Sequence, residues 1–336
     1  QRYDYEHMTN QEILTVIREA GIVGMGGAGF PAHVKLSPSP DKKIDTIIVN
    51  GAECEPFLSS DFRLLIEEPK KVVEGLKIIL HMFPEAHGYI AIENNKPTAL
   101  SLMRLLTTEE ERITVVPLKT KYPQGGEKQL INAVTGREVP SGGLPADAGC
   151  IVHNADTIVA IYRALLEGRP LMRRIITIAG GAIAHATTFK VRIGTNVREL
   201  IEAAGGLTCT PSKVICGGPM MGTALFSLDV PVVKGTSGIL LFDEHQDAVL
   251  EETACIRCGK CVAACPIHLM PMMLNQFALE RDWASFEKYH GMDCMECGSC
   301  AYICPAKRHL TQSFKAGKKI ISAQRKKAAA QSAAGK

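Results

Sequence analysis

Two cysteine runs of identical spacing restrict this chain more than any other feature of its sequence. The pattern C-x2-C-x2-C-x3-C-P occurs at Cys255, Cys258, Cys261 and Cys265, and again at Cys294, Cys297, Cys300 and Cys304. In such a run the first three cysteines hold one [4Fe–4S] cluster, and the fourth reaches the other cluster. The spacing therefore predicts two clusters with crossed ligation. The first cluster site is Cys255, Cys258, Cys261 and Cys304, and the second cluster site is Cys294, Cys297, Cys300 and Cys265.

Zinc is the alternative occupant of such a region. Zinc is typically held by four cysteines in two separated C-x2-C pairs, and it needs neither a third cysteine at the same step nor the closing Cys-Pro. Eight of the 12 cysteines lie between positions 255 and 304, which indicates metal in a reducing compartment rather than disulfides. We expect the other four to be small buried hydrophobic residues. They are Cys54, Cys150, Cys209 and Cys216.

The composition is that of a globular chain. With 336 residues, 46% of them hydrophobic, the chain can bury a sizeable core in two or three domains. No run of about 18 apolar residues exists, so no transmembrane segment is predicted. The formal charge of +3 is too small to indicate nucleic-acid binding. Because the chain begins with Gln and shows no signal peptide, we expect it to be a processed piece with something upstream.

The pattern of hydrophobic residues divides the chain into four parts. Positions 1–170 alternate helical segments such as 69–83 and 154–168 with short strands at 46–50, 88–92 and 113–118, which predicts an α/β domain. Positions 171–245 read as strands around one short helix. Positions 246–315 hold the cysteines, and 316–336 form a basic tail without acidic residues. We expect this tail to be a frayed helix or disordered, and docking to an acidic partner or anionic lipid is the alternative.

A glycine-rich loop near the N-terminus has the spacing G-x-G-x-x-G, at Gly24, Gly26 and Gly29. A doubly wound dinucleotide fold needs a strand before such a loop. Here Thr9 and Glu12 form a capping-box pattern, which predicts a helix instead. The loop is therefore either a ligand-binding loop of another kind or a tight turn.

The electron chemistry of the clusters favours a ligand-binding loop. Clusters take one electron at a time, whereas a nicotinamide gives a hydride, and a flavin can connect the two. Glu53 and Glu55 follow a predicted strand, and Glu127 follows a glycine pair in "KYPQGGEKQL". Each stretch alone is typical of a turn with solvated carboxylates. Together with a two-cluster terminus they predict a flavin and nicotinamide pocket.

The same stretches resemble known families. "GMGGAGFPAHVK", "NGAECEP", "YPQGGE" and "HNADT" are similar to the flavin-binding segments of the NADH-oxidising subunit of respiratory complex I. From about position 9 to 312 the chain resembles the C-subunit family of the Rnf electron-transport complex, a ferredoxin:NAD+ oxidoreductase that couples redox chemistry to ion pumping. "GGPMMG" and "MDCMECGSCAYICPAK" carry that resemblance together with the long stretch from "YPQGGE" to "ADAG".

The resemblance implies a fold and a set of site residues. The fold class is α/β, with a Rossmann-like FMN/NADH domain of the complex I type, a β-grasp soluble-ligand-binding module and an α-helical two-cluster ferredoxin-type domain. No catalytic acid or base is implied, and Glu53, Glu55 and Glu127 would position the nicotinamide. The residues implied to line the cofactors are Gly24, Gly26, Gly27, Ala28, Gly29, Phe30, Lys35, Asn50, Glu53, Cys54, Glu55, Tyr122, Gly125, Glu127, His153, Asn154 and Thr157.

The implied function is electron transfer between NAD(H), FMN and two [4Fe–4S] clusters. The chain would be an oxidoreductase subunit on the cytoplasmic side of the bacterial inner membrane, in a complex that pumps Na+ or H+ and receives electrons from ferredoxin through other subunits. One alternative is the cobalamin reductase of propanediol-utilising compartments. Another is an iron–sulfur electron relay without flavin. Nucleic-acid binding through zinc is disfavoured by the small net charge and the few aromatic residues.

Three positions depart from the complex I pattern. Met25 stands where that loop has Arg, Ala52 where it has Asp, and Gly126 where it has Glu. The resemblance also implies a further barrel-like domain ahead of the first residue of this chain. These departures leave the flavin role as predicted and the nicotinamide contacts open.

Overall fold

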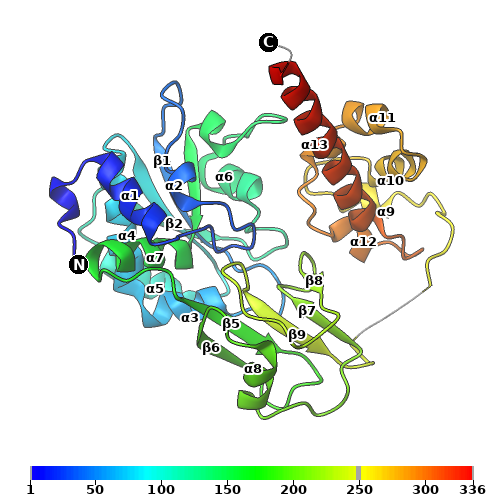
Figure 1. Cartoon of the computed structure of the whole chain (residues 1–336), viewed down its shortest axis with the longest axis horizontal. Helices are drawn as coiled ribbons and strands as arrows, with labels where there is room; N and C mark the ends of the chain where they lie inside the picture. The colour runs from blue at the N-terminus through cyan, green and yellow to red at the C-terminus, as the bar shows by residue number, and fades with distance from the viewer. Residues whose placement is uncertain (1, 247–250, 335–336) are drawn as a thin grey trace. The chain divides into compact units, whose positions relative to one another are not determined.

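The computed structural model describes residues 2–246 and 251–334. The chain forms two compact units, one over positions 1–247 and one over 248–336, and each is considered by itself. Figure 1 shows the parallel sheet and the mixed sheet of the first unit, and the helices of the second. The cysteine runs lie in the second unit, and the glycine loop lies in the first.

The first unit is built on a four-stranded parallel sheet in the order β3-β2-β1-β4. Its strands are β1 (Thr46–Gly51), β2 (His87–Glu93), β3 (Ile113–Leu118) and β4 (Cys150–Asn154). The register pairs Asn50 of β1 with Asn154 of β4, so both side chains lie at the carboxyl edge of the sheet. All three strands expected from the sequence are present within one residue of their expected ends.

Helices cover both faces of this sheet. Ile47 and Val49 of β1 belong to one core with α1 (Asn10–Glu19), α4 (Pro69–Met82), α5 (Pro97–Leu106) and α7 (Ala155–Leu166). Ile48, between them, faces the other way and packs with Leu130 and Ile131 of α6 (Glu127–Thr135). This alternation follows from the two-residue period of a strand, and a strand buried on both faces reads as a continuous apolar run.

The capping box predicted ahead of the glycine loop is present. The Thr9 hydroxyl accepts a hydrogen bond from the backbone N–H of Glu12, and the Glu12 carboxylate accepts one from the Thr9 N–H. Gly21 follows α1 with φ of 66°, the left-handed conformation that ends helices. A helix therefore precedes the loop, as expected, and the ordinary doubly wound arrangement is absent from this part of the described chain. The short segments nearby are η1 (Tyr5–His7), α2 (Ala32–Lys35), α3 (Ser60–Glu67) and η2 (Pro145–Ala148).

The second module of this unit is a five-stranded mixed sheet in the order β6-β5-β9-β7-β8. Its elements are β5 (Arg173–Ala179), β6 (Thr187–Arg192), α8 (Val197–Ala203), β7 (Lys213–Cys216), β8 (Thr223–Ala224) and β9 (Gly238–Phe242). Ile176, Ile178 and Leu241 form its core with α8 residues. The backbone N–H of Ser59, just before α3, donates to the Thr177 hydroxyl of β5 at 3.0 Å, so the module is bonded to the first domain.

The second unit is helical. Its elements are α9 (Lys260–Ala263), α10 (Pro271–Glu280), α11 (Trp283–Lys288), η3 (Gly291–Asp293), α12 (Ser299–Tyr302) and α13 (Leu310–Ala334). Leu274, Phe286 and Phe314 are buried at its centre. The predicted division at 315/316 falls inside α13, because the tail continues this helix without a break. Beyond Ser322 every side chain described to position 332 is exposed.

The four isolated cysteines differ from one another. Cys150 is buried and Cys54 and Cys216 are half-buried, but Cys209 is exposed, so the expectation of burial was wrong for Cys209. Within the described residues no helix is both long and apolar enough to cross a membrane.

The contact between α4 and α7 gives a stability prediction. A Cβ at Gly75 would lie 2.5 Å from the carbonyl oxygen of Ile158, so Gly75→Ala forces the two helices apart. We expect the free energy of unfolding of this domain to fall by about 1–3 kcal/mol, measured by denaturant unfolding. Lys70→Ala, at an exposed position of the same helix, is the control. An unchanged midpoint for Gly75→Ala would contradict the packing.

Candidate functional site

The glycine loop is closed on itself by backbone hydrogen bonds. The N–H of Gly24 donates to the carbonyl of Phe30 at 2.7 Å, and the N–H of Gly29 donates to the carbonyl of Gly24 at 3.2 Å. Gly27 and Gly29 have φ values of 110° and 65°, and a Cβ built at either would meet no atom within 4 Å. The loop therefore presents bare backbone to open space, which is the surface a flat or phosphorylated ligand can approach closely.

Met25 anchors this loop to the rest of the domain. Its side chain is 1% exposed, and its N–H donates to the hydroxyl of Thr157 at 3.0 Å. Its carbonyl accepts a bond of 3.1 Å from Arg174, which is itself ion-paired with Asp156. Both charged side chains are nearly fully buried. Complex I has Arg at this place in the resembling loop. Here the Met25 side chain is buried, and the backbone N–H and carbonyl of Met25 make the bonds that fix the loop.

The loops after β1 and before α6 are bonded to one another. Asn50 donates from Nδ2 to the carbonyl of Gly125 at 2.8 Å and accepts from the N–H of Ala52 at 3.0 Å. The N–H of Gly125 donates to the sulfur of Cys54 at 3.3 Å. A Cβ at Gly125 would lie 2.4 Å from the carbonyl oxygen of Ala52, so this close approach requires glycine. Tyr122 precedes Pro123 through a cis peptide bond.

Lys35 and Glu127 form an ion pair across the same region. Both were implied as cofactor residues, and they come from α2 and from the first residue of α6. Glu127 at a helix N-terminus is favoured by the helix dipole. The pair thus holds a lysine ammonium at the carboxyl edge of the sheet.

His153 lies at the end of β4 with 2% of its surface exposed. Its Nε2 atom has no hydrogen-bond partner among the described residues. Burial, and then the charge of Lys35, lowers the pKa of His153 to about 3, so the imidazole is neutral. A buried ring nitrogen without a partner is costly in a folded protein and marks a place where a ligand can supply one.

Asn154 connects the sheet edge to a cluster of carboxylates. Its Oδ1 caps α7 by accepting from the N–H of Asp156, and its Nδ2 donates to Asp61 at 2.6 Å. Burial, and then the carboxylates of Glu53 and Asp156, raises the pKa of Asp61 to about 7, against the opposing charge of Arg174. Asp61 thus titrates near neutral pH beside the glycine loop.

Glu53 and Glu55 are both engaged by backbone N–H groups. Glu53 accepts from Asp61 at 3.0 Å and from Phe62 at 3.2 Å, at the start of α3. Glu55 accepts from Met220 at 3.0 Å and Met221 at 2.8 Å, in the "GGPMMG" loop of the second module. The resemblance implied that both border the nicotinamide. In the structure Glu53 stabilises a helix start, and Glu55 joins the two sheets of the unit.

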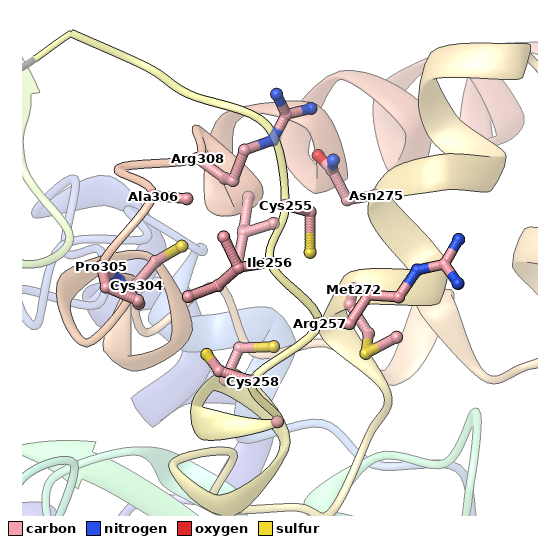
Figure 2. A pocket seen from close by; sticks show the side chains of 13 residues that line it. Cys255, Ile256, Arg257, Cys258, Met272, Asn275, Cys304, Pro305, Ala306 and Arg308 are labelled. Carbon is pink, nitrogen blue, oxygen red and sulfur yellow. The ribbon is translucent and has the colours of Figure 1, made fainter.

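Each predicted cluster set lines its own cavity in the second unit. Cys255, Cys258, Cys261 and Cys304 line one cavity, and Figure 2 labels three of them around it. Cys265, Cys294, Cys297 and Cys300 line another. The cysteines of a set surround a space rather than converge on a point. Within the described residues no group of three or more His, Cys, Asp or Glu side chains could hold a single metal ion. Each cavity is thus lined by three cysteines of one run and the fourth of the other, the sets that the crossed spacing predicts.

Burial shapes the chemistry of these thiols. Burial raises the pKa of Cys294 to about 11 and that of Cys300 to about 12. Because only the thiolate binds iron, cluster assembly must release these protons.

Three comparisons with known proteins agree with this geometry. Family models match in chain order: the Nuo51 FMN-binding domain over residues 17–163, the SLBB domain over 175–224 and the 4Fe–4S dicluster domain over 254–307. The chain is 48% identical over 310 residues, 92% of its length, to the C subunit of the proton-translocating ferredoxin:NAD(+) oxidoreductase complex of Clostridium ljungdahlii, and covers 68% of that protein. It is 47% identical to the C subunit of the Na(+)-translocating complex of Acetobacterium woodii, a match that covers 96% of this chain and 73% of that protein.

The chain belongs to the C-subunit family of ion-translocating ferredoxin:NAD(+) oxidoreductase complexes. The C subunit of the ion-translocating oxidoreductase complex of Cronobacter sakazakii is 41% identical over 82% of this chain, which spans 36% of that longer protein. Among solved structures, a chain of an NAD+-reducing [NiFe]-hydrogenase in the H2-reduced state superposes with a TM-score of 0.61 at 21% identity. That match covers 88% of this chain and 52% of the hydrogenase chain, and it shows the fold alone.

Sequence reasoning missed three residues of this site. Asp61 and Arg174 belong to no motif. Arg174 lies in β5 and is buried only because the two modules pack together. Gly218 was part of a quoted motif but had no role. A Cβ there would lie 2.3 Å from the Glu55 carboxyl carbon, so glycine is required where the loop meets this carboxylate.

Asp61 gives a pH prediction. Folding raises the pKa of Asp61 from its unfolded value of about 4 to about 7. The fold is therefore most stable below about pH 4, where the carboxyl is protonated in both states, and its stability falls as pH rises to about 7. The Asp61→Asn variant is uncharged at this position at every pH. At pH 8 we therefore expect its free energy of unfolding to exceed that of the parent by about 1–3 kcal/mol. Denaturant unfolding from pH 5 to 8 measures this. Glu109→Gln, at an exposed turn, is the control, and parallel profiles for Asp61→Asn and the parent would contradict the assignment.

Proposed function

We propose that this chain passes electrons between NAD(H), FMN and two [4Fe–4S] clusters, as the oxidoreductase subunit of a membrane-associated complex that pumps ions. The observation that carries the proposal is the combination in one chain of an FMN-binding domain, with an open glycine loop, and eight cysteines that line two cavities as crossed sets. Either feature alone is compatible with other roles. A chain with both can convert two-electron into one-electron chemistry.

Bound FMN supplies that conversion, since a flavin accepts a hydride and releases single electrons. The chain provides the cradle. The backbone of Gly26 to Gly29 would hold the ring system, and Lys35 would offer its ammonium to the phosphate. The unpartnered Nε2 of the neutral His153 ring would exchange a hydrogen bond with the ligand, as donor or acceptor according to the tautomer.

The loops after β1 and before α6 would hold the nicotinamide. Hydride transfer needs stacking and exclusion of water more than an acid or base. Asn50 and Gly125 fix these loops to one another, which keeps the facing walls at constant separation. Glu53 and Glu55 act by positioning α3 and the "GGPMMG" loop, as their bonds to backbone N–H groups support.

The proposed setting is the cytoplasmic face of a bacterial cell membrane, with attachment through other subunits. Ferredoxin supplies electrons indirectly, and NAD(H) binds this chain. The relatives support membership of a translocating complex, since their names describe one that moves protons and another that moves Na+. The chain is almost equally identical to the proton-translocating and the Na+-translocating relative, so the proposed ion is H+ or Na+.

Gly26 provides a graded test of the cradle. A Cβ at Gly26 would sit 3.6 Å from that of Asn154, an ordinary contact, so Gly26→Ala should retain FMN. Gly26→Val adds two methyl groups against the ligand space, and we expect it to lose at least about tenfold in FMN affinity, the effect of overpacking a well-packed site. Flavin released from the anaerobically purified protein measures this.

The clusters are the internal control of the same experiment. Both variants should keep eight irons, because the cysteines lie in the other unit. NADH should bleach the visible absorbance of the Ala variant but not of the Val variant, while dithionite bleaches both. Full flavin content and full NADH response in Gly26→Val would show that the loop is only a turn.

A further inference from the structure

The second unit contains an internal repeat, in which positions 255–280 correspond to the positions 39 residues later. The cysteine runs match at this offset, and so do α9 with α12 and the first residues of α10 and α13. The backbone repeats as well. Left-handed φ values recur at equivalent positions, in the pairs Arg257 (55°) and Glu296 (59°), Gly259 (75°) and Gly298 (81°), and His268 (55°) and Lys307 (52°).

The polar contacts of the two cysteine loops depart from this repeat. Lys318 of α13 donates to the carbonyl of Cys294 at 2.6 Å and pairs with Glu296 at 2.7 Å. In the first half the residues equivalent to Glu296 and Lys318 are Arg257 and Leu279. No hydrogen bond or ion pair joins that pair in the described residues, and Leu279 is 61% exposed. Figure 2 shows the Arg257 guanidinium directed away from the cysteine sulfur atoms.

The exposure of the two cysteine loops differs accordingly. Cys255 and Cys258 are exposed, together with all residues between them. Their counterparts Cys294 and Cys297 are half-buried and buried, and the residues between them are half-buried. Backbone N–H groups donate to sulfur in both sets. In the second set they run from Glu296 to Cys294 at 3.4 Å and from Leu269 to Cys265 at 3.3 Å, and in the first set Met272 bonds Cys261.

We propose that Lys318 is a positioning residue that closes the second cluster site and makes the two sites inequivalent. This rests on the proposed function, in which both sites hold [4Fe–4S] clusters. Lys318 fixes the loop that carries Cys294, so that water and reagents reach the second site slowly. In the first cluster site Arg308 pairs with Glu252, ahead of Cys255, but no ion pair of the described residues involves Arg257. Cys255 and Cys258 stay exposed, so this site is the open end of the pair. Since exposure and bonds to sulfur set cluster potentials, the two sites also differ in midpoint potential.

Iron release from the anaerobic protein measures the inequivalence. With excess bathophenanthroline disulfonate we expect two phases of about four irons each, a fast one from the open site and a slow one from the closed site. Lys318→Met should accelerate the slow phase about tenfold, the effect of losing one charge-assisted hydrogen bond, and leave the fast phase unchanged. Lys318→Arg should restore most of the slow rate, because Arg can keep both partners.

The repeat supplies the converse variant. Arg257→Glu with Leu279→Lys places the same ion pair at the equivalent positions, and we expect the fast phase to slow. Potentiometric EPR gives an independent readout, in which Lys318→Met moves one of two midpoint potentials and Lys318→Arg moves it less. A merely structural defect would shift both midpoints and accelerate both phases.

The outcomes separate this inference from the proposed function. A purified chain without eight irons would overturn the function, and with it the inference. Eight irons released in one phase, or two phases that Lys318→Met changes equally or not at all, would overturn the inference alone.

Discussion

The flavin site depends on one constraint, the parallel register of β1 and β4. Parallel strands end at a common edge, and this register brings Asn50 and Asn154 together there. Asn50 then bonds the loop before α6, and Asn154 caps α7 and contacts Asp61. A slip of one residue would turn these side chains to the opposite face of the sheet. The tight packing of cores on both faces therefore also fixes the positions of the polar groups.

A buried ion pair extends this edge into the second module. Arg174 of β5 pairs with Asp156 of α7 and also bonds the carbonyls of Met25 and Thr236. Removing one partner of such a pair costs about 3–5 kcal/mol, because the other charge stays buried. Glu55 makes a second connection, to the backbone of the "GGPMMG" loop. The β-grasp module is thus part of the wall around the glycine loop, which explains why two modules form one compact unit.

Local patterns in the sequence predicted local structure, but they could not predict which distant residues contact one another. Cysteine spacing predicted the two crossed sets that line the cavities, because ligand geometry fixes the spacing within a few residues. The capping box predicted α1 for the same reason. The partners of Glu53, Glu55 and Arg174 depend on packing between elements up to 166 positions apart, and no short motif records that. Beyond Ser322 the side chains of α13 described to position 332 are exposed, so apolar periodicity could not decide between the frayed helix and the disordered tail that the sequence allowed. The roles of individual residues toward FMN and the nicotinamide stay predictions.

The central claim is that one chain connects a nicotinamide to two iron–sulfur clusters through FMN. It is tested most directly by an anaerobic assay of iron, sulfide and released flavin on the purified chain, followed by a titration with NADH under visible absorbance. The account predicts about eight irons and one FMN for each chain, with bleaching of both flavin and cluster absorbance by NADH. Eight irons without flavin and without a response to NADH would contradict it, and would leave the chain as an electron relay.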